Sequence, residues 1–174
     1  RMVYRFNNNF HRLLVFIYAI ANKGKGEIQK AIDAASPGDI VEIPSGIYYE
    51  NILIYKPITL LGEDPKTTII DGGGGSKNGG LSGKNVVKIT SNDVTISGFT
   101  MRNGGADAVV LVSSNVVVTN NIITHNEGAG VRSTKSLEII LNETGNIIQG
   151  NTISNNTYGG IAVRFNKDLQ ISNN

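Results

Sequence analysis

The 174-residue sequence contains no cysteine and no tryptophan, and its only histidines are His11 and His125. The absence of cysteine excludes disulfide bonds and thiolate metal sites, although it leaves the redox compartment open. The two histidines lie far apart in the chain and form no spaced ligand set. Charged residues make up 17% of the chain and aromatic residues 6%, and the net charge is +2. This balance is too weak to argue for nucleic acid as a partner.

The chain is instead rich in glycine, with 21 residues, and in asparagine, and its second half is a repeat. Three segments align at offsets of 22 and 30 residues: Ile96–Met101, Val118–Ile123 and Ile148–Ile153. A further copy begins at Ile171 and is interrupted at Asn174, so we expect the last repeat to be incomplete. Repeats of this length indicate a solenoid, in which each unit buries its apolar face by stacking on the next.

The pattern within each repeat predicts short strands, because apolar residues alternate with polar ones in brief runs that are separated by turn-forming residues. Pairs that show this alternation are Val94 and Ile96, Val109 and Leu111, Val116 and Val118, and Ile161 and Val163. At roughly 3.3 Å per residue, a 22-residue unit suits one coil of three strands. The pattern therefore predicts a parallel β-helix. Asparagines recur in register at two predicted bends, in the columns Asn121–Asn151–Asn174 and Asn126–Asn156, which favours side-chain ladders inside the bends.

The N-terminal half predicts a cap followed by the first coils. Residues 27–35 show helical spacing of apolar residues and are expected to form a short helix over the open end of the solenoid. Strands are expected at 40–43, 48–54, 58–62 and 67–70, and outward loops at 71–80 and 138–146.

Residues 1–21 are of another character. Basic residues precede the apolar run Leu13–Tyr18, which ends in Ala19-Ile20-Ala21. This is the pattern of a signal peptide, and the alternative is a capping segment on the first coil. The run is too short for a membrane-spanning helix. We therefore divide the chain into residues 1–21, a signal peptide or cap, and residues 22–174, a C-terminally incomplete β-helix domain. An uncovered last coil would expose strand edges, through which this polypeptide is expected to self-associate.

Three blocks carry a resemblance to a known superfamily: residues 28–39, Gly46–Asn51 and Pro57–Glu63. They resemble the first coil of the right-handed parallel β-helix, or pectin lyase-like, superfamily. The segment Ile96–Asn103 and the Asn-x-Ile units are similar to the repeats of its NosD-like branch, which is also described as carbohydrate-binding proteins and sugar hydrolases. The resemblance implies an all-β, single-stranded right-handed parallel β-helix with a short N-terminal capping helix.

The catalytic motifs of the superfamily's enzymes are absent. The chain lacks the Gln-Asp-Thr-Leu run of pectin methylesterases, the Asn-Thr-Asp and Gly-His-Gly motifs of polygalacturonases, and the Asp-Pro-His of alginate epimerases. The Trp-Ile-Asp-His of pectate lyases is missing too. Whether the chain is an enzyme is left open, because an incomplete solenoid could place a site in later coils.

Outward positions supply the candidate binding residues. Arg132 lies between two inward residues, Arg164 follows one coil later, and Arg102 occupies an outward column with Thr124 and Ser154. Arginine binds carboxylates in a bidentate manner, so a basic face would suit an acidic polymer such as a uronate. The alternative is scattered surface charge.

Asp107, Glu127 and His125 are the candidate catalytic residues. Two carboxylates on adjacent coils could reach the separation that glycoside hydrolysis requires, and His125 could act as a base. His125 also aligns with Asn103 and Asn155, which suggests a polar bend residue instead. No cofactor is expected: Asp71 and Asp93 look isolated, clustered copper ligands are lacking, and no pattern supports a Ca²⁺ site, although Ca²⁺ would be the ion to consider.

Three functions remain open. The first is a secreted or cell-surface β-helix, extracellular or periplasmic, that binds a polysaccharide along an outer sheet. The second is a polysaccharide lyase or glycoside hydrolase with a site partly beyond residue 174. The third is a structural surface spacer. Outward columns discriminate among them: aromatic or arginine residues in line favour binding, converging carboxylates favour catalysis, and Ser, Thr and Asn alone favour a spacer.

Overall fold

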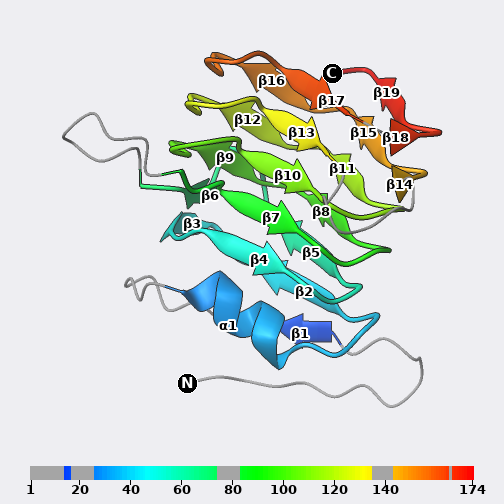
Figure 1. Cartoon of the computed structure of the whole chain (residues 1–174). Coiled ribbons are helices and arrows are strands. Elements are labelled where there is room, and N and C mark those ends of the chain that lie inside the picture. The colour runs from blue at the N-terminus through cyan, green and yellow to red at the C-terminus, as the bar shows by residue number, and fades with distance from the viewer. Residues whose placement is uncertain (1–13, 17–25, 74–82, 135–142, 165) are drawn as a thin grey trace.

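The computed structural model describes residues 14–16, 26–73, 83–134, 143–164 and 166–174, and these wind into a stack of coils with one helix at the N-terminal end (Figure 1). The helix is α1 (Glu27–Ala34). The strands are β1 (Leu14–Phe16), β2 (Ile40–Ile43), β3 (Gly46–Tyr49), β4 (Ile52–Ile54), β5 (Thr59–Gly62), β6 (Thr68–Asp71), β7 (Val87–Ile89), β8 (Thr95–Ser97), β9 (Thr100–Arg102), β10 (Val109–Leu111), β11 (Val117–Thr119), β12 (Ile122–Thr124), β13 (Val131–Ser133), β14 (Glu143–Thr144), β15 (Ile147–Gln149), β16 (Thr152–Ser154), β17 (Ile161–Val163), β18 (Asn166–Lys167) and β19 (Gln170–Ser172).

Successive coils stack into three parallel sheets. Sheet A has the order β1-β2-β5-β8-β11-β15-β19, sheet B the order β3-β6-β9-β12-β16, and sheet C the order β4-β7-β10-β13-β17. A short parallel pair, β14 with β18, lies apart from them. Val118 pairs with Ile96 on one side and Ile148 on the other, which are the partners that the repeat offsets predict. The all-β parallel solenoid with an N-terminal helix is thus confirmed.

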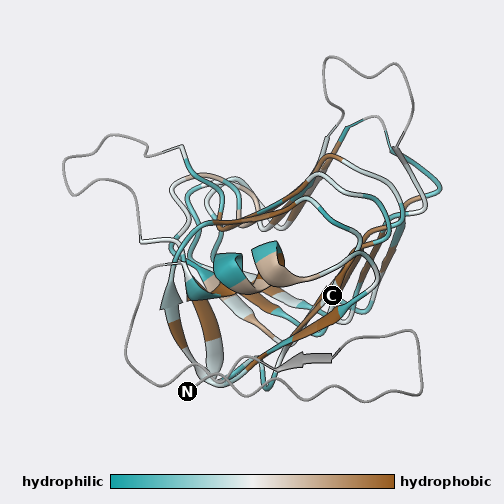
Figure 2. Cartoon of the chain, turned by 90° about the horizontal axis from the view of Figure 1, so that it is seen from below, coloured by the Kyte–Doolittle hydropathy of each residue, from teal (hydrophilic) through white to brown (hydrophobic). Residues whose placement is uncertain are grey.

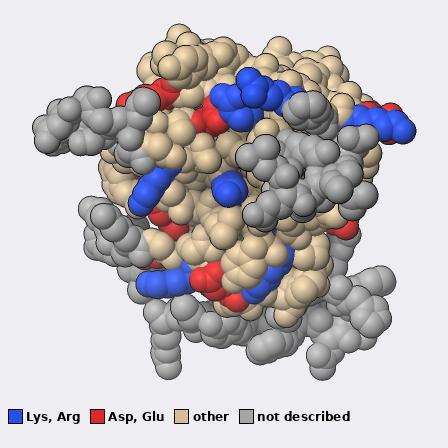
Figure 3. Space-filling view, in the orientation of Figure 1, with Lys and Arg blue, Asp and Glu red and all other residues tan. Residues whose placement is uncertain are grey.

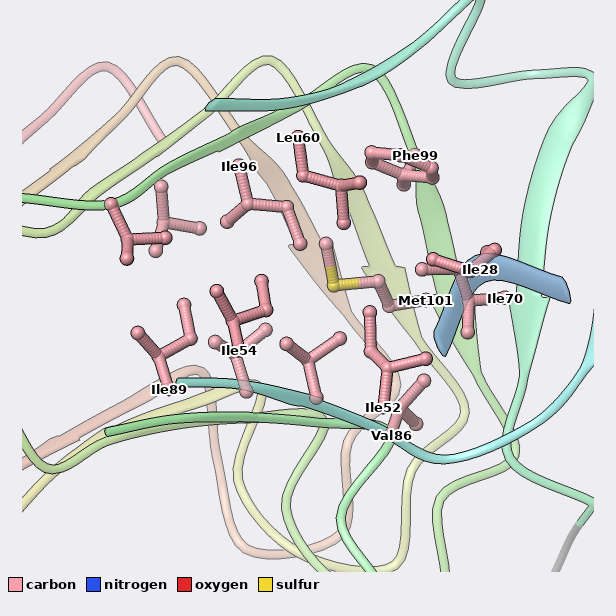
Figure 4. Close-up of a cluster of buried hydrophobic side chains, with 14 of the residues drawn as sticks. Ile28, Ile52, Ile54, Leu60, Ile70, Val86, Ile89, Ile96, Phe99 and Met101 are labelled. Carbon is pink, nitrogen blue, oxygen red and sulfur yellow. The ribbon is translucent and has the colours of Figure 1, made fainter. Parts of the chain in front are cut away.

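The core fills the space between the three sheets, because strand residues alternate between the inside and the outside of each coil. Viewed along the stack, apolar segments line the inside and α1 lies across the end (Figure 2). Isoleucine side chains from successive coils meet Phe99 and Met101 there (Figure 4). Phe99, Met101, Leu60 and Ile96 are each 0% exposed. Burial of this aliphatic stack supplies most of the stabilisation, at about 25 cal/mol per Å² of apolar surface removed from water.

Left-handed residues turn the chain at the bends, with φ between 52° and 85°. They form three columns: Gly98, Asn120, Gly150 and Asn173; Asn103, His125 and Asn155; and Asp93, Asn115, Gly145 and Asp168. Glycine, asparagine and aspartate tolerate this conformation better than other residues. The bends therefore explain why these residues punctuate the sequence at regular intervals.

Buried asparagines follow several of these left-handed residues and form ladders. Asn121 Nδ2 and its backbone N–H donate to Asn151 Oδ1 at 3.2 and 3.1 Å, and Asn151 donates to Asn174 Oδ1 in the same manner at 2.9 and 3.1 Å. Asn126 is bonded to Asn156 at 2.8 and 3.1 Å. Both predicted ladder columns are confirmed. A further buried asparagine, Asn146, accepts from the Val116 N–H at the third bend, and the register argument missed it.

The N-terminal end is closed by α1, which packs on β2 and β4 through Ile28, Ala31 and Ile32. The predicted single strand over 48–54 is wrong, because β3 and β4 are separated at Glu50. The Glu50 carboxylate turns inward, is 9% exposed, and accepts from the Ile28 and Gln29 N–H groups at 3.0 and 3.1 Å. It thereby caps the first turn of α1, whose orphan N–H groups need acceptors.

Strand β1 adds to the end of sheet A beside β2, as a capping segment would. The rest of residues 1–21 lies outside the described residues, so the division at residue 21 stays a prediction. The predicted loops fall partly outside them as well, at 74–80 and 138–142. The described part of the chain contains no helix with the length and apolar character needed to cross a membrane.

Candidate functional site

The outward residues of sheet B form one face of the solenoid, which we call the sheet B outer face, and two of them, Asp71 and Thr100, are only 5% and 8% exposed. Strand pairing places its first column in register from coil to coil, as Tyr49, Asp71, Arg102, Thr124 and Ser154. A second column runs beside it, as Ile47, Ile69, Thr100, Ile122 and Thr152. Neighbouring strands are about 4.8 Å apart, so each column repeats with that spacing along the solenoid axis.

The N-terminal end of this face is aromatic and apolar. Tyr49 is 56% exposed and Ile47 is 45% exposed. The preceding tyrosine, Tyr48, turns inward, is 7% exposed, and donates its hydroxyl to the Pro44 carbonyl at 2.8 Å. Burial raises the pKa of Tyr48 to about 12. The alternation of the strand therefore separates the two tyrosines into a core residue and a surface residue.

The middle of the face holds an ion pair between adjacent coils. Arg102 Nε donates to Asp71 Oδ2 at 2.9 Å, with 35% of the arginine side chain and 6% of the aspartate side chain exposed. Asn103 Nδ2 donates to the same oxygen at 2.9 Å, and the Gly73 N–H donates to Oδ1 at 3.0 Å. Asp71, which looks isolated in the sequence, is thus the counter-ion of a predicted binding residue.

Hydroxyl groups occupy the C-terminal part of the face. Thr124 Oγ1 lies 3.3 Å from Ser154 Oγ and 2.9 Å from His125 Nδ1. His125 is exposed and has a φ of 55°, the same value as Asn103. Its backbone is therefore left-handed like that of Asn103, the bend residue with which the alignment pairs it. The structure therefore brings His125 to the edge of the column that contains Arg102 and Thr124.

A second cluster lies at sheet C, where Arg132 forms a bidentate ion pair with Asp107. Arg132 Nε donates to Asp107 Oδ2 at 2.5 Å and Nη2 donates to Oδ1 at 2.9 Å. The Ala129 N–H donates to Asp107 Oδ1 at 2.7 Å. This carboxylate is 8% exposed and raises the pKa of Arg132. Asp107 joins two coils, and both of its oxygens are engaged.

Within the described part of the chain, no side-chain hydrogen bond or ion pair joins the other predicted residues, Glu127 and Arg164, to these clusters. Glu127 is half-buried, and its backbone N–H donates to Gly104 O at 2.9 Å. Arg164 is exposed and follows β17, in which Ala162 is the residue paired with Arg132. Catalysis by Asp107 and Glu127 stays a prediction. The engagement of both Asp107 oxygens argues against that residue as a free acid or base.

Sequence reasoning missed two outward residues. Tyr49 is one, and Lys88 is the other: it is exposed on β7 between Leu53 and Val110 of the neighbouring coils. The alternation Val87-Lys88-Ile89 could have indicated that Lys88 points outward. On the face seen in Figure 3, basic and acidic side chains are interspersed among uncharged ones. No group of three or more His, Cys, Asp or Glu residues within the described ranges is placed to hold a metal ion.

Comparison with known proteins adds one finding. The family model described as right handed beta helix region matches residues 83–174, more than half of the chain. No curated protein and no solved structure matches the chain.

Proposed function

Because the chain belongs to the right-handed β-helix family, we propose that it binds a polysaccharide along the sheet B outer face. The observation that carries this proposal is the in-register column of Tyr49, Asp71, Arg102, Thr124 and Ser154. The fold alone leaves function open, so the proposal depends on the chemistry of that column.

The column offers the kinds of contact that a sugar chain requires. A pyranose ring has a face of C–H groups, which packs on an aromatic ring, and a rim of hydroxyls, which need hydrogen-bond partners. The exposed ring of Tyr49 provides the first contact, and the hydroxyls of Thr124 and Ser154 provide the second. Since the column repeats about every 4.8 Å, a linear polymer that lies along it can contact one coil after another.

A binding role is better supported than catalysis in the described coils. Asp107 is held by Arg132 and by the Ala129 N–H, and Asp71 is held by Arg102 and Asn103. Carboxylates that are engaged in this way serve as structural counter-ions. A lyase or glycoside hydrolase and a surface spacer are the alternatives that the test below separates from binding. We further propose an extracellular, cell-surface or periplasmic location and membership of the NosD-like branch.

The test is a binding assay of the purified chain against a set of linear polysaccharides, with calorimetry or retardation in polysaccharide-containing gels. Tyr49→Ala should weaken binding by about tenfold, because an aromatic contact of roughly 1 kcal/mol is lost together with its buried area. The matched control is Tyr158→Ala, which removes a tyrosine that is 73% exposed and lies outside the column. Binding by none of the polymers would favour the spacer, and release of reducing or unsaturated sugars would favour the enzyme.

A further inference from the structure

The sheet B outer face has no net charge. Its ten outward residues include one cation, Arg102, and one anion, Asp71, and these two form an ion pair. The remaining residues are aliphatic, aromatic or hydroxylic: Tyr49, Thr124, Ser154, Ile47, Ile69, Thr100, Ile122 and Thr152. A polymer that lies on this face therefore meets no excess of charge of either sign.

The positive charge of the arginine on this face is already balanced by a buried carboxylate. Asp71 accepts hydrogen bonds from Arg102, Asn103 and Gly73, and only 6% of its side chain is exposed. An anionic ligand that took over Arg102 would leave the Asp71 carboxylate buried without its charge partner, which is strongly unfavourable. The ion pair uses Nε, and 35% of the arginine side chain stays exposed, so its remaining N–H groups can donate to a neutral oxygen.

The exposed aromatic ring of this face also favours an uncharged ligand. Tyr49 is 56% exposed, and no cation lies over its ring among the described residues. The other exposed tyrosine of the first coil, Tyr55, has Lys56 at 5.3 Å from its ring centroid and donates its hydroxyl to Asp33 at 2.9 Å. Tyr49 is consequently the platform on which the C–H face of a sugar ring can stack, beside an Asp71–Arg102 ion pair that has no net charge.

Sheet C provides the contrasting surface within the same molecule. Its central outward column contains Leu53, Lys88, Val110, Arg132 and Ala162. Arg132 is neutralised by Asp107, whereas Lys88 is exposed and has no ion pair among the described residues. Lys88 is thus the point at which an acidic polymer would be held if it bound to sheet C instead.

From this distribution of charge we infer that the ligand of the sheet B outer face is a neutral, hydroxyl-rich polysaccharide and not a uronate or sulfated polymer. This inference rests on the proposed function, since it names the class of glycan that the same face binds. It is an alternative to the basic-face prediction for Arg102 and Arg132, since both guanidinium groups have buried carboxylates as partners.

The experiment titrates the chain with neutral polymers (β-glucan, mannan and unsubstituted xylan) and with acidic ones (polygalacturonate and alginate), each at low and at high salt. Neutral polymers should bind with an affinity that changes less than about twofold with salt, because no net charge is screened. Tyr49→Ala and Thr124→Val should each weaken this binding about tenfold, whereas Lys88→Ala should leave it unchanged. Urea unfolding of each variant verifies that the fold is intact.

The outcomes separate the two proposals. Tight, salt-sensitive binding of the acidic polymers that is lost in Lys88→Ala and kept in Tyr49→Ala would overturn the inference while leaving polysaccharide binding intact. Binding of neutral polymers that survives both Tyr49→Ala and Thr124→Val would show that this face is not the site. Failure of both classes to bind would overturn the proposed function itself, and the choice of a neutral ligand with it.

Discussion

The asparagine ladder makes a quantitative prediction at Asn121, the residue that links three coils. Its Oδ1 accepts from the Phe99 N–H at 3.0 Å, and its Nδ2 lies 3.1 Å from Ile96 O, 2.8 Å from Thr119 O and 3.2 Å from Asn151 Oδ1. The residue is 2% exposed, so water cannot replace these partners. Asn121→Ala removes every one of the side-chain bonds while leaving the backbone bond to Asn151 in place.

The expected loss follows from the groups that are left unsatisfied. A buried N–H without a partner costs about 1–3 kcal/mol, and each lost hydrogen bond contributes about 1 kcal/mol. We therefore expect Asn121→Ala to lower the free energy of unfolding by about 3–5 kcal/mol, a large fraction of the roughly 5–15 kcal/mol of a typical domain. Urea denaturation with a linear extrapolation measures this change directly.

Two further substitutions test whether lost buried hydrogen bonds are the cause of this destabilisation. Asn155→Gly keeps the left-handed backbone and removes an exposed side chain at a neighbouring bend, so it should change stability by less than about 0.5 kcal/mol. Asn121→Asp keeps the acceptor for Phe99 but turns a buried carboxylate toward three oxygen atoms. Its pKa in the folded state should therefore exceed the unfolded value of about 3.9, so its stability should recover as the pH falls.

The ladder account would be refuted by one result in particular. A loss of less than about 1 kcal/mol in Asn121→Ala, with an unchanged dependence on urea, would mean that the asparagine amides contribute little beyond filling space. Equal stability of Asn121→Asp at neutral and acidic pH would likewise contradict the ladder account, because that account predicts a raised pKa for the buried carboxylate.

Three other predictions concern the ends and bends of the solenoid. Burial raises the pKa of Glu50 above 4.5, so its contribution to stability is present below that pH and is lost as the pH rises through its folded pKa; Glu50→Gln should abolish this part of the pH dependence in urea titrations. Gly98→Ala should lower the free energy of unfolding by more than about 3 kcal/mol, because the new Cβ would lie 2.3 Å from Gly62 O at a φ of 85°. Gly150→Ala should lower it by only about 1 kcal/mol, since the nearest atom to its Cβ is 3.8 Å away. Thermal melts of the two variants compare these losses. Ile171 is 49% exposed on β19, the edge strand of sheet A among the described residues, so Ile171→Lys should shift sedimentation of a polypeptide of these 174 residues toward the monomer if this edge pairs between molecules.

Inward positions could be predicted from the sequence because one physical requirement fixes them in every coil. Val118 must meet Ile96 and Ile148 in the core, so the apolar spacing gives the register without further information. The same holds for Asn121 and Asn151, because only a short amide side chain satisfies the N–H and C=O groups that a tight bend leaves inside.

The ion pairs could not be predicted in this way. Asp71 and Arg102 are 31 residues apart and Asp107 and Arg132 are 25 apart, and neither separation equals a repeat offset seen in the sequence. Asp71 meets Arg102 because the loop between their strands sets their register, whereas Asp107 reaches a side chain three residues beyond its own register position on the next coil. The break at Glu50 could not be predicted either, since nothing in the local pattern shows that α1 lies within reach of its carboxylate.

The contrast between the two sides of sheet B shows where specificity can reside in such a fold. The inward column is apolar throughout, as Tyr48, Ile70, Met101, Ile123 and Ile153, whereas the outward column beside it changes residue type at every coil. Stacking in the core restricts the inward column to apolar residue types, whereas it places no such restriction on the outward column. Because the outward chemistry passes from an aromatic ring through an ion pair to hydroxyls, a bound polymer would meet different groups at its two ends. We therefore expect the face to select the direction of a glycan chain as well as its composition, and oligosaccharides that are spin-labelled at the reducing end would report a single orientation if this reasoning is right.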